Sequence, residues 1–165
     1  MSKEPLISII IGSASDAETL AGCRRALESY AIAHEIKILS AHRTPGELVA
    51  HVEGLEARGV RLVIAAAGMS AHLAGVVAAH TALPVLGVPV AAGALAGVDA
   101  LLSTSQMPPG VPVGCLGIGA PGATNAAHLA ARILAGSDPA LRARLTEQTR
   151  SMREKVLAAT VPPLA

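Results

Sequence analysis

The chain has 165 residues, a length that predicts a single domain over 1–165 with its core at 5–136. Its net charge is +1. Its Lys and Arg residues are scattered, which excludes the basic patch of a nucleic-acid-binding protein. Hydrophobic residues make up 52% of the chain, but polar or helix-breaking residues interrupt every stretch of about 20, which excludes a membrane-spanning helix.

The first half of the chain alternates between apolar runs and helical periodicity. We expect a strand over 6–11, a helix over 15–30, a strand over 34–39 and a helix over 44–58. Ser15 with Glu18, and Thr44 with Glu47, have the spacing of capping boxes at the two helix starts. Gly59 is expected to end the second helix.

The second half continues the alternation and adds a helix at its end. We expect strands over 62–67, 85–88 and 113–118, and helices over 71–80, 99–105 and 124–134. Asp138 and Pro139 cap a final helix over 138–158. Its narrow apolar stripe is typical of a helix that docks on another surface, so we expect it to pack on a neighbouring subunit. Residues 161–165 are expected to fray.

This alternation predicts an α/β, three-layer sandwich with a flavodoxin-like, doubly wound parallel sheet and a C-terminal helix. The core must be aliphatic, because Tyr30 is the only aromatic residue. The many alanines and the low charge favour an oligomer. Cys23 and Cys115 are too few for a disulfide framework, which favours the reducing cytoplasm.

Ligands of such sheets bind at the carboxyl ends of the strands, so the loops after the strands hold the candidate residues. The loop after the first strand offers the hydroxyls of Ser13 and Ser15 at a helix N-terminus, which suits a phosphate. Asp16 suits ribose hydroxyls instead. The alternative is that Ser15 only caps the helix and Gly12 only turns the chain.

The loops after the second and third strands contain three further candidates. His42 can give and take a proton near neutral pH, and Arg43 can clamp a phosphate or carboxylate. His72 opens the following short helix and could line the same crevice, although a capping or core histidine is an equal alternative for it. An ordinary polar surface loop is the alternative for His42 and Arg43. The remaining histidines are expected to face solvent or to have structural roles: His34, His51, His80 and His128.

Taken together, the loops resemble those of the N5-carboxyaminoimidazole ribonucleotide mutase family. The matching motifs are GSxSD, SAHRTP, AHLxG, LPVxGVP and QMPxGxPVG, and they lie in this order within residues 6–136. The resemblance implies a flavodoxin-like subunit, a homo-octamer and a phosphorylated ribonucleotide as substrate. It implies no metal and no organic cofactor.

The resemblance also implies roles for individual residues. His42 would be the catalytic acid and base, and His72 would help to wall in a migrating carboxylate. The residues implied to bind substrate are Ser13, Ser15, Asp16, Ser40, Ala41, Arg43, Gly68, Ser70, His72 and Leu73. The implied reaction releases carbon dioxide from the exocyclic nitrogen, traps it, and lets C4 of the imidazole attack it.

The third loop departs from the family pattern AGAGGAAHLPG. Ala66 and Met69 stand where the pattern has glycine, Ser70 replaces an alanine, and Ala74 replaces the proline; Ala17 replaces a frequent Trp in the first loop. A side chain at Met69 could narrow the pocket or change its backbone. Two alternatives therefore stay open: a carboxylase that uses free carbon dioxide and aminoimidazole ribonucleotide, and a non-catalytic nucleotide-binding module.

Overall fold

A computed structural model describes residues 4–160 and places five parallel strands in one sheet. They are β1 (Ile7–Ile11), β2 (His34–Ile38), β3 (Leu62–Gly68), β4 (Val85–Val90) and β5 (Gly114–Cys115). The strand order is β2-β1-β3-β4-β5, so the sheet runs outward in two directions from β1 and β3. This order confirms the flavodoxin-like, doubly wound sheet.

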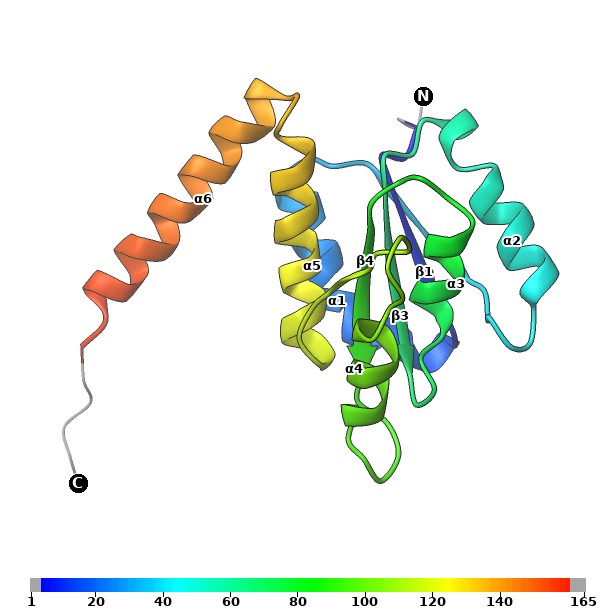
Figure 1. The fold of residues 1–165 in the computed structure, drawn as a ribbon. Helices are drawn as coiled ribbons and strands as arrows, with labels where there is room; N and C mark the ends of the chain where they lie inside the picture. Colours follow the sequence, from blue (N-terminus) through cyan, green and yellow to red (C-terminus); the bar gives the residue numbers. More distant parts are fainter. Residues whose placement is uncertain (1–3, 161–165) are drawn as a thin grey trace.

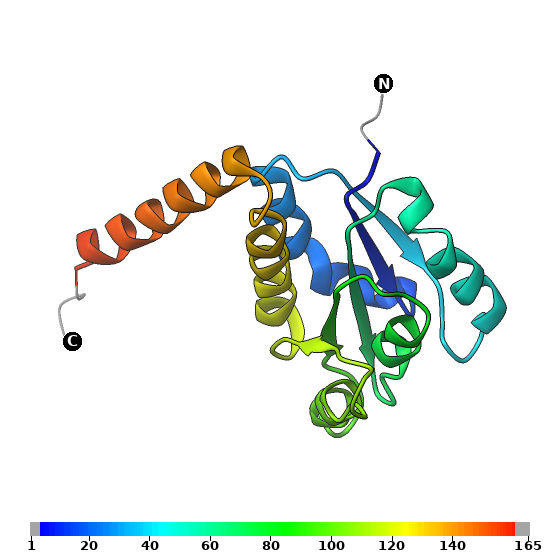
Figure 2. The same ribbon diagram turned by 45° about the horizontal axis from the view of Figure 1, so that its top comes forward.

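Helices cover both faces of the sheet (Figure 1). One face carries α1 (Ala21–Ser29) and α5 (Gly119–Leu134), and the other carries α2 (Pro45–Glu53) and α3 (Leu73–Ala79), with α4 (Val98–Ser105) beside β4. Two 3₁₀ helices, η1 (Ala14–Leu20) and η2 (Glu56–Arg58), extend the ends of α1 and α2. The last helix, α6 (Pro139–Ala158), projects away from the three layers in both ribbon views (Figures 1 and 2).

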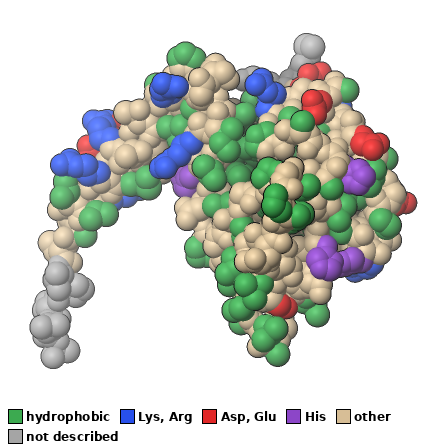
Figure 3. Space-filling view, viewed as in Figure 1, with side chains coloured by type: hydrophobic (Ala, Val, Ile, Leu, Met, Phe, Trp, Pro, Cys, Tyr) green, Lys and Arg blue, Asp and Glu red, His purple; other side chains and the backbone are tan. Residues whose placement is uncertain are grey.

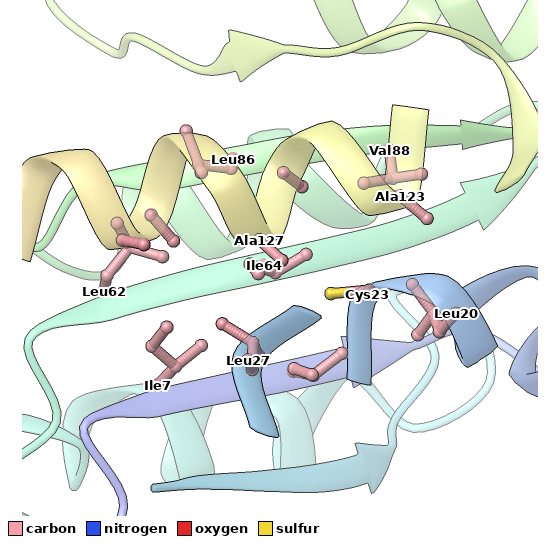
Figure 4. Close-up of a cluster of buried hydrophobic side chains, with 14 of the residues drawn as sticks. Ile7, Leu20, Cys23, Leu27, Leu62, Ile64, Leu86, Val88, Ala123 and Ala127 are labelled. Atoms are coloured by element: carbon pink, nitrogen blue, oxygen red, sulfur yellow. The ribbon is translucent and has the colours of Figure 1, made fainter. Parts of the chain in front are cut away.

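Two aliphatic clusters form the core, one on each face of the sheet. Figure 4 shows the cluster under α1 and α5, where Leu27, Ile64 and Ala127 are fully buried. Small alanines on α5 let the helix lie close to the strands. The single aromatic residue, Tyr30, belongs to this cluster. Its hydroxyl oxygen lies 2.8 Å from Nδ1 of His128.

The helix starts differ from the predicted capping boxes. The cap of η1 is Ser13, whose Oγ accepts from the Ser15 amide, so the predicted box at Ser15 is wrong. Thr44 does precede α2, but its Oγ1 accepts from the Ser40 amide at 2.8 Å and makes no cap bond, so the second box is also wrong. In both places the side chain of the predicted cap residue hydrogen-bonds to other loop residues and not to the helix amides.

Two boundaries in the second half also differ from prediction. The helix α5 begins at Gly119, five residues earlier than expected, and β5 has only two residues. The early start depends on Gly122, because a Cβ there would lie 1.5 Å from the Gly117 oxygen. Asp138 caps α6 as predicted, with Oδ1 accepting from the Leu141 amide at 3.0 Å. The expectation for 161–165 lies outside the described residues.

A partly buried polar cluster joins β1, β2 and the α2–η2 segment. The Ser8 hydroxyl, fully buried, donates to Glu35 Oε1 at 3.0 Å and lies 3.1 Å from Nε2 of His51. Arg58 donates twice to Glu35, at 2.9 and 2.7 Å. The Arg58 hydrogen bonds lower the pKa of Glu35, and burial lowers the pKa of His51. This cluster fixes α2 against the strand that leads into the second loop.

Much of the exposed apolar surface lies on the later helices. Leu95, Val98 and Leu102 are at least half exposed, and apolar atoms gather over α4 and the loop before it (Figure 3). Val156 and Leu157 on α6 are more exposed still. None of the helices described within 4–160 combines the length and apolar character needed to cross a membrane.

Candidate active site

A cavity of about 670 Å³ opens at the carboxyl ends of β1, β2 and β3. The three loops that follow these strands form it, together with one residue after β4. The lining residues are Gly12, Ser13, Ser15, Asp16, Ser40, Ala41, His42, Arg43, Ala67, Gly68, Met69, Ser70, His72, Leu73 and Ala92. Histidine and basic side chains are exposed at this edge of the molecule (Figure 3).

The first loop forms a compact group of hydroxyls and a carboxylate. Ser15 Oγ donates to Ser13 Oγ at 2.9 Å and to Asp16 Oδ1 at 3.4 Å. Desolvation raises the pKa of Asp16, against the opposing effects of the hydrogen bonds from Ser15 and Ser13 and of the Arg43 charge. The loop therefore offers hydroxyl donors beside a carboxylate that can accept hydrogen bonds from sugar hydroxyls.

Ser40 and Thr44 hold the second loop in shape. Thr44 Oγ1 accepts from the Ser40 amide and donates to the Ser40 carbonyl, at 2.8 and 3.2 Å. Ser40 Oγ in turn accepts from the amides of His42 and Arg43. Arg43 Nη2 donates to the Gly12 carbonyl at 2.7 Å, which ties the second loop to the first. The backbone that presents His42 is therefore held by several hydrogen bonds.

His42 and His72 form a pair across the cavity. His42 Nε2 lies 2.9 Å from His72 Nδ1, and the two rings meet edge to face at 85°. One nitrogen must donate and the other accept, so the hydrogen bond couples the tautomers of the two rings. Both residues are exposed to the cavity. The pair can therefore hold and move a single proton at this end of the site.

The third loop has a constrained backbone. A Cβ at Gly68 would lie 3.1 Å from the Val90 oxygen and 3.2 Å from Ala92 Cβ, so β4 leaves little space for a side chain there. Met69 has a φ of 56°, in the left-handed region that favours glycine. The amides of Ala71 and His72 donate to the carbonyls of Met69 and Ser70, at 2.8 and 2.7 Å.

The structure brings all eleven candidate residues to this one cavity, including Ala41, Gly68, Ser70 and Leu73. It adds Gly12, Ala67, Met69 and Ala92, which were not candidates. Ala92 follows β4, so the rule that ligands meet the carboxyl ends of strands could have found it. Ala67 lies inside β3, and no sequence signal distinguishes it from a core alanine.

The other histidines have structural partners, as expected. His34 Nδ1 lies 3.0 Å from the Ile32 oxygen, and His80 Nδ1 lies 3.8 Å from Glu53 Oε1. His51 and His128 belong to the polar cluster and to the Tyr30 contact described above.

Burial raises the pKa of the Cys23 thiol to about 12, which makes it unreactive at neutral pH. Within residues 4–160, no three His, Cys, Asp or Glu side chains gather as metal ligands.

Comparison with known proteins gives consistent matches along the chain. The family model of AIR carboxylase matches residues 6–155. The N5-carboxyaminoimidazole ribonucleotide mutase of Brucella melitensis is 52% identical over 150 residues, which cover 91% of this chain and 93% of that protein. The mutase of Bacillus subtilis is 46% identical over 154 residues, covering 93% and 95%. The crystal structure of Treponema denticola PurE superposes with a TM-score of 0.84 at 29% identity, covering 93% and 94%.

Proposed function

The chain belongs to the AIR carboxylase family, and we propose that it is the mutase that converts N5-carboxyaminoimidazole ribonucleotide into 4-carboxy-5-aminoimidazole ribonucleotide in purine biosynthesis. The enzyme is an isomerase. The observation that carries this proposal is the high identity to curated mutases over nine tenths of the chain. The cavity that contains the His42–His72 pair supports it independently.

The first two loops hold the ribonucleotide in this proposal. Ser13, Ser15 and Arg43 bind the phosphate, because hydroxyls and a guanidinium are good donors to phosphate oxygens. Asp16 accepts from ribose hydroxyls, which keeps its carboxylate away from the phosphate. Ser40 supports this arrangement through its bonds to the backbone of the second loop. The aminoimidazole ring then lies toward Gly68, Ser70, His72 and Leu73, with Ala41 beside it.

The reaction moves one carboxyl group and one proton within the same molecule. The bond between the exocyclic nitrogen and the carboxyl carbon breaks, and its electron pair stays with the aminoimidazole. C4 then uses a pair of the ring system to form the new bond to carbon dioxide. His42 takes the C4 proton and returns a proton to the exocyclic nitrogen, so substrate and product have the same atoms and charge.

His72 acts on His42 through the hydrogen bond between the two rings. When His42 carries the proton, His72 Nδ1 accepts from His42 Nε2 and holds the ring in place. Such a partner stabilises the protonated ring and fixes its orientation. His72 is therefore a positioning residue for His42 as well as part of the cavity wall.

The direct test is an assay of the purified protein with N5-carboxyaminoimidazole ribonucleotide, with product formation followed by absorbance. We expect turnover by the wild type and a loss of at least about 100-fold in His42→Asn. Binding of ligand without turnover in the wild type would support a non-catalytic module instead. Turnover only with aminoimidazole ribonucleotide and free carbon dioxide would support the carboxylase.

Variants at His72 test the positioning role. We expect His72→Ala to lower kcat by about tenfold, with a smaller change in KM, because the His42 ring loses its partner. His72→Asn places an acceptor oxygen near the position of Nδ1 and is expected to recover much of that loss. Equal activity of His72→Ala and the wild type would contradict the role.

We also propose that the chain assembles into a homo-octamer and works in the cytoplasm. The exposed side chains of Leu95, Val98 and Leu102, and those on α6, support the assembly because monomers seldom expose so much apolar surface. Two cysteines without a disulfide support the compartment.

A further inference from the structure

Met69 combines two features that are unusual for a cavity residue. Its backbone has a left-handed φ of 56°, which is unfavourable for any residue with a side chain. Its side chain is apolar and long, yet 61% exposed at the cavity. Ordinary packing explains neither feature, because an exposed methionine contributes little to the core.

The neighbours of Met69 prevent the loop from relaxing. Gly68 is held against the end of β4, where the Val90 oxygen and Ala92 Cβ leave little space for a Cβ. On the other side, the Met69 carbonyl accepts from the Ala71 amide at 2.8 Å. The backbone is therefore constrained on both sides of Met69, whose side chain lines the cavity.

The cavity wall contains three apolar side chains besides that of Met69. They belong to Ala67, Leu73 and Ala92, and none of the three can donate or accept a hydrogen bond. Such a wall suits carbon dioxide, which is apolar and uncharged, better than it suits the carboxylate from which it forms. A methionine adds a flexible apolar cover to this wall, because its unbranched chain adapts to the shape beneath it.

We propose that Met69 is a cover residue that retains released carbon dioxide over the aminoimidazole ring. The inference rests on the proposed mutase reaction. After the bond from nitrogen to carbon breaks, two outcomes compete. Either C4 attacks the carbon dioxide that has just been released, or that molecule leaves and dissolved carbon dioxide from the solvent takes its place before C4 attacks. Met69 favours the first outcome by closing the route to solvent.

An isotope experiment measures this competition. The substrate carries carbon-13 in its migrating carboxyl group, and the buffer contains unlabelled bicarbonate and dissolved carbon dioxide. Mass spectrometry then gives the fraction of product that has lost its label. We expect wild-type product to retain the label, and Met69→Ala and Met69→Gly to increase the unlabelled fraction by about fivefold, because an opened site admits solvent. Met69→Leu keeps an apolar side chain and is expected to stay close to the wild type.

The two small variants separate the side chain from the backbone. Met69→Ala keeps the strained left-handed position, whereas Met69→Gly relieves it. Label loss in both supports the cover. Wild-type retention of label in both would overturn it, and label loss in only one would assign the effect to the backbone and overturn it as well. Product formation by the wild type tests the proposed function, whereas the isotope content of the product tests the role of Met69. The two can therefore fail independently.

Discussion

Single side chains in this protein often connect segments that are far apart in sequence. Arg43 donates to the Gly12 carbonyl, and His42 bonds to His72, so each of the three site loops is held by another. The same principle applies below the site, where Glu35 accepts from Ser8 and Arg58. The site is therefore sensitive to residues that never touch the ligand.

His51 gives a test of this sensitivity through the pH dependence of stability. Burial lowers its pKa in the folded state below the ordinary value of 6.5, against the raising effect of the Glu35 charge. As the pH falls below that value, the unfolded chain binds a proton that the folded chain still excludes. The free energy of unfolding must therefore fall with the pH until the folded pKa is passed.

We predict that His51→Gln reduces this loss of stability. A glutamine amide can reach the position of Nε2 and donate to Ser8 without titrating. Urea unfolding at about pH 7.5 and about pH 5.5 would measure the difference, at one protein concentration. Some loss should remain in the variant, because burial also lowers the pKa of His128. An unchanged loss would show that the His51 contribution is absent.

At the scale of elements, sequence patterns predicted all five strands and the order of the helices. Strands β1, β3 and β4 were readable because each is a largely apolar run, whereas β2 alternates polar and apolar residues. The helix starts were not readable, because they depend on bonds between loop residues, such as the Ser40 amide to Thr44 Oγ1. The start of α5 was missed because glycines and Pro121 resemble a loop in sequence, although Gly122 is the residue that lets the helix pack.

The same limit applies to the candidate site. Six lining residues were candidates because they follow strands: Ser13, Ser15, Asp16, His42, Arg43 and His72. The other five were implied only by the family resemblance. The left-handed φ of Met69 was not predictable, because it depends on the contact of Gly68 with the end of β4. The bond between His42 and His72 was not predictable either, because thirty residues separate them.

Two glycines in helices offer a matched test of element packing. We predict that Gly122→Ala lowers the free energy of unfolding by about 2 kcal/mol or more, because its Cβ would meet backbone that cannot give way. Gly46→Ala in α2 has nothing within 4 Å of its Cβ. It is expected to stabilise the protein by about 0.5 kcal/mol through the better helix propensity of alanine. Equal effects in thermal or urea unfolding would contradict the close approach at Gly122.

At the scale of the whole molecule, α6 is held to the rest of the domain at its beginning only. Its first turns pack on the domain through Leu141 and Leu145, and Arg144 donates to the Tyr30 carbonyl. Beyond these turns the helix projects from the body in both ribbon views (Figures 1 and 2). A helix this exposed gains little stability from its own chain, and we propose that its apolar positions pack on a partner surface.

Substitution of these apolar positions tests that reason without disturbing the fold. Met152, Val156 and Leu157 are 42%, 75% and 67% exposed, so their replacement by glutamine should leave the domain intact. We predict that the triple variant forms smaller assemblies than the wild type in light scattering, and that truncation after Gly136 does the same. The matched control replaces Glu147 and Glu154 on the same helix by glutamine, which changes charge but leaves the apolar residues in place. Wild-type assembly size in both the triple variant and the truncation would show that α6 does not hold the subunits together. The contact between subunits would then have to lie elsewhere, and the apolar side chains over α4 would be the next surface to test.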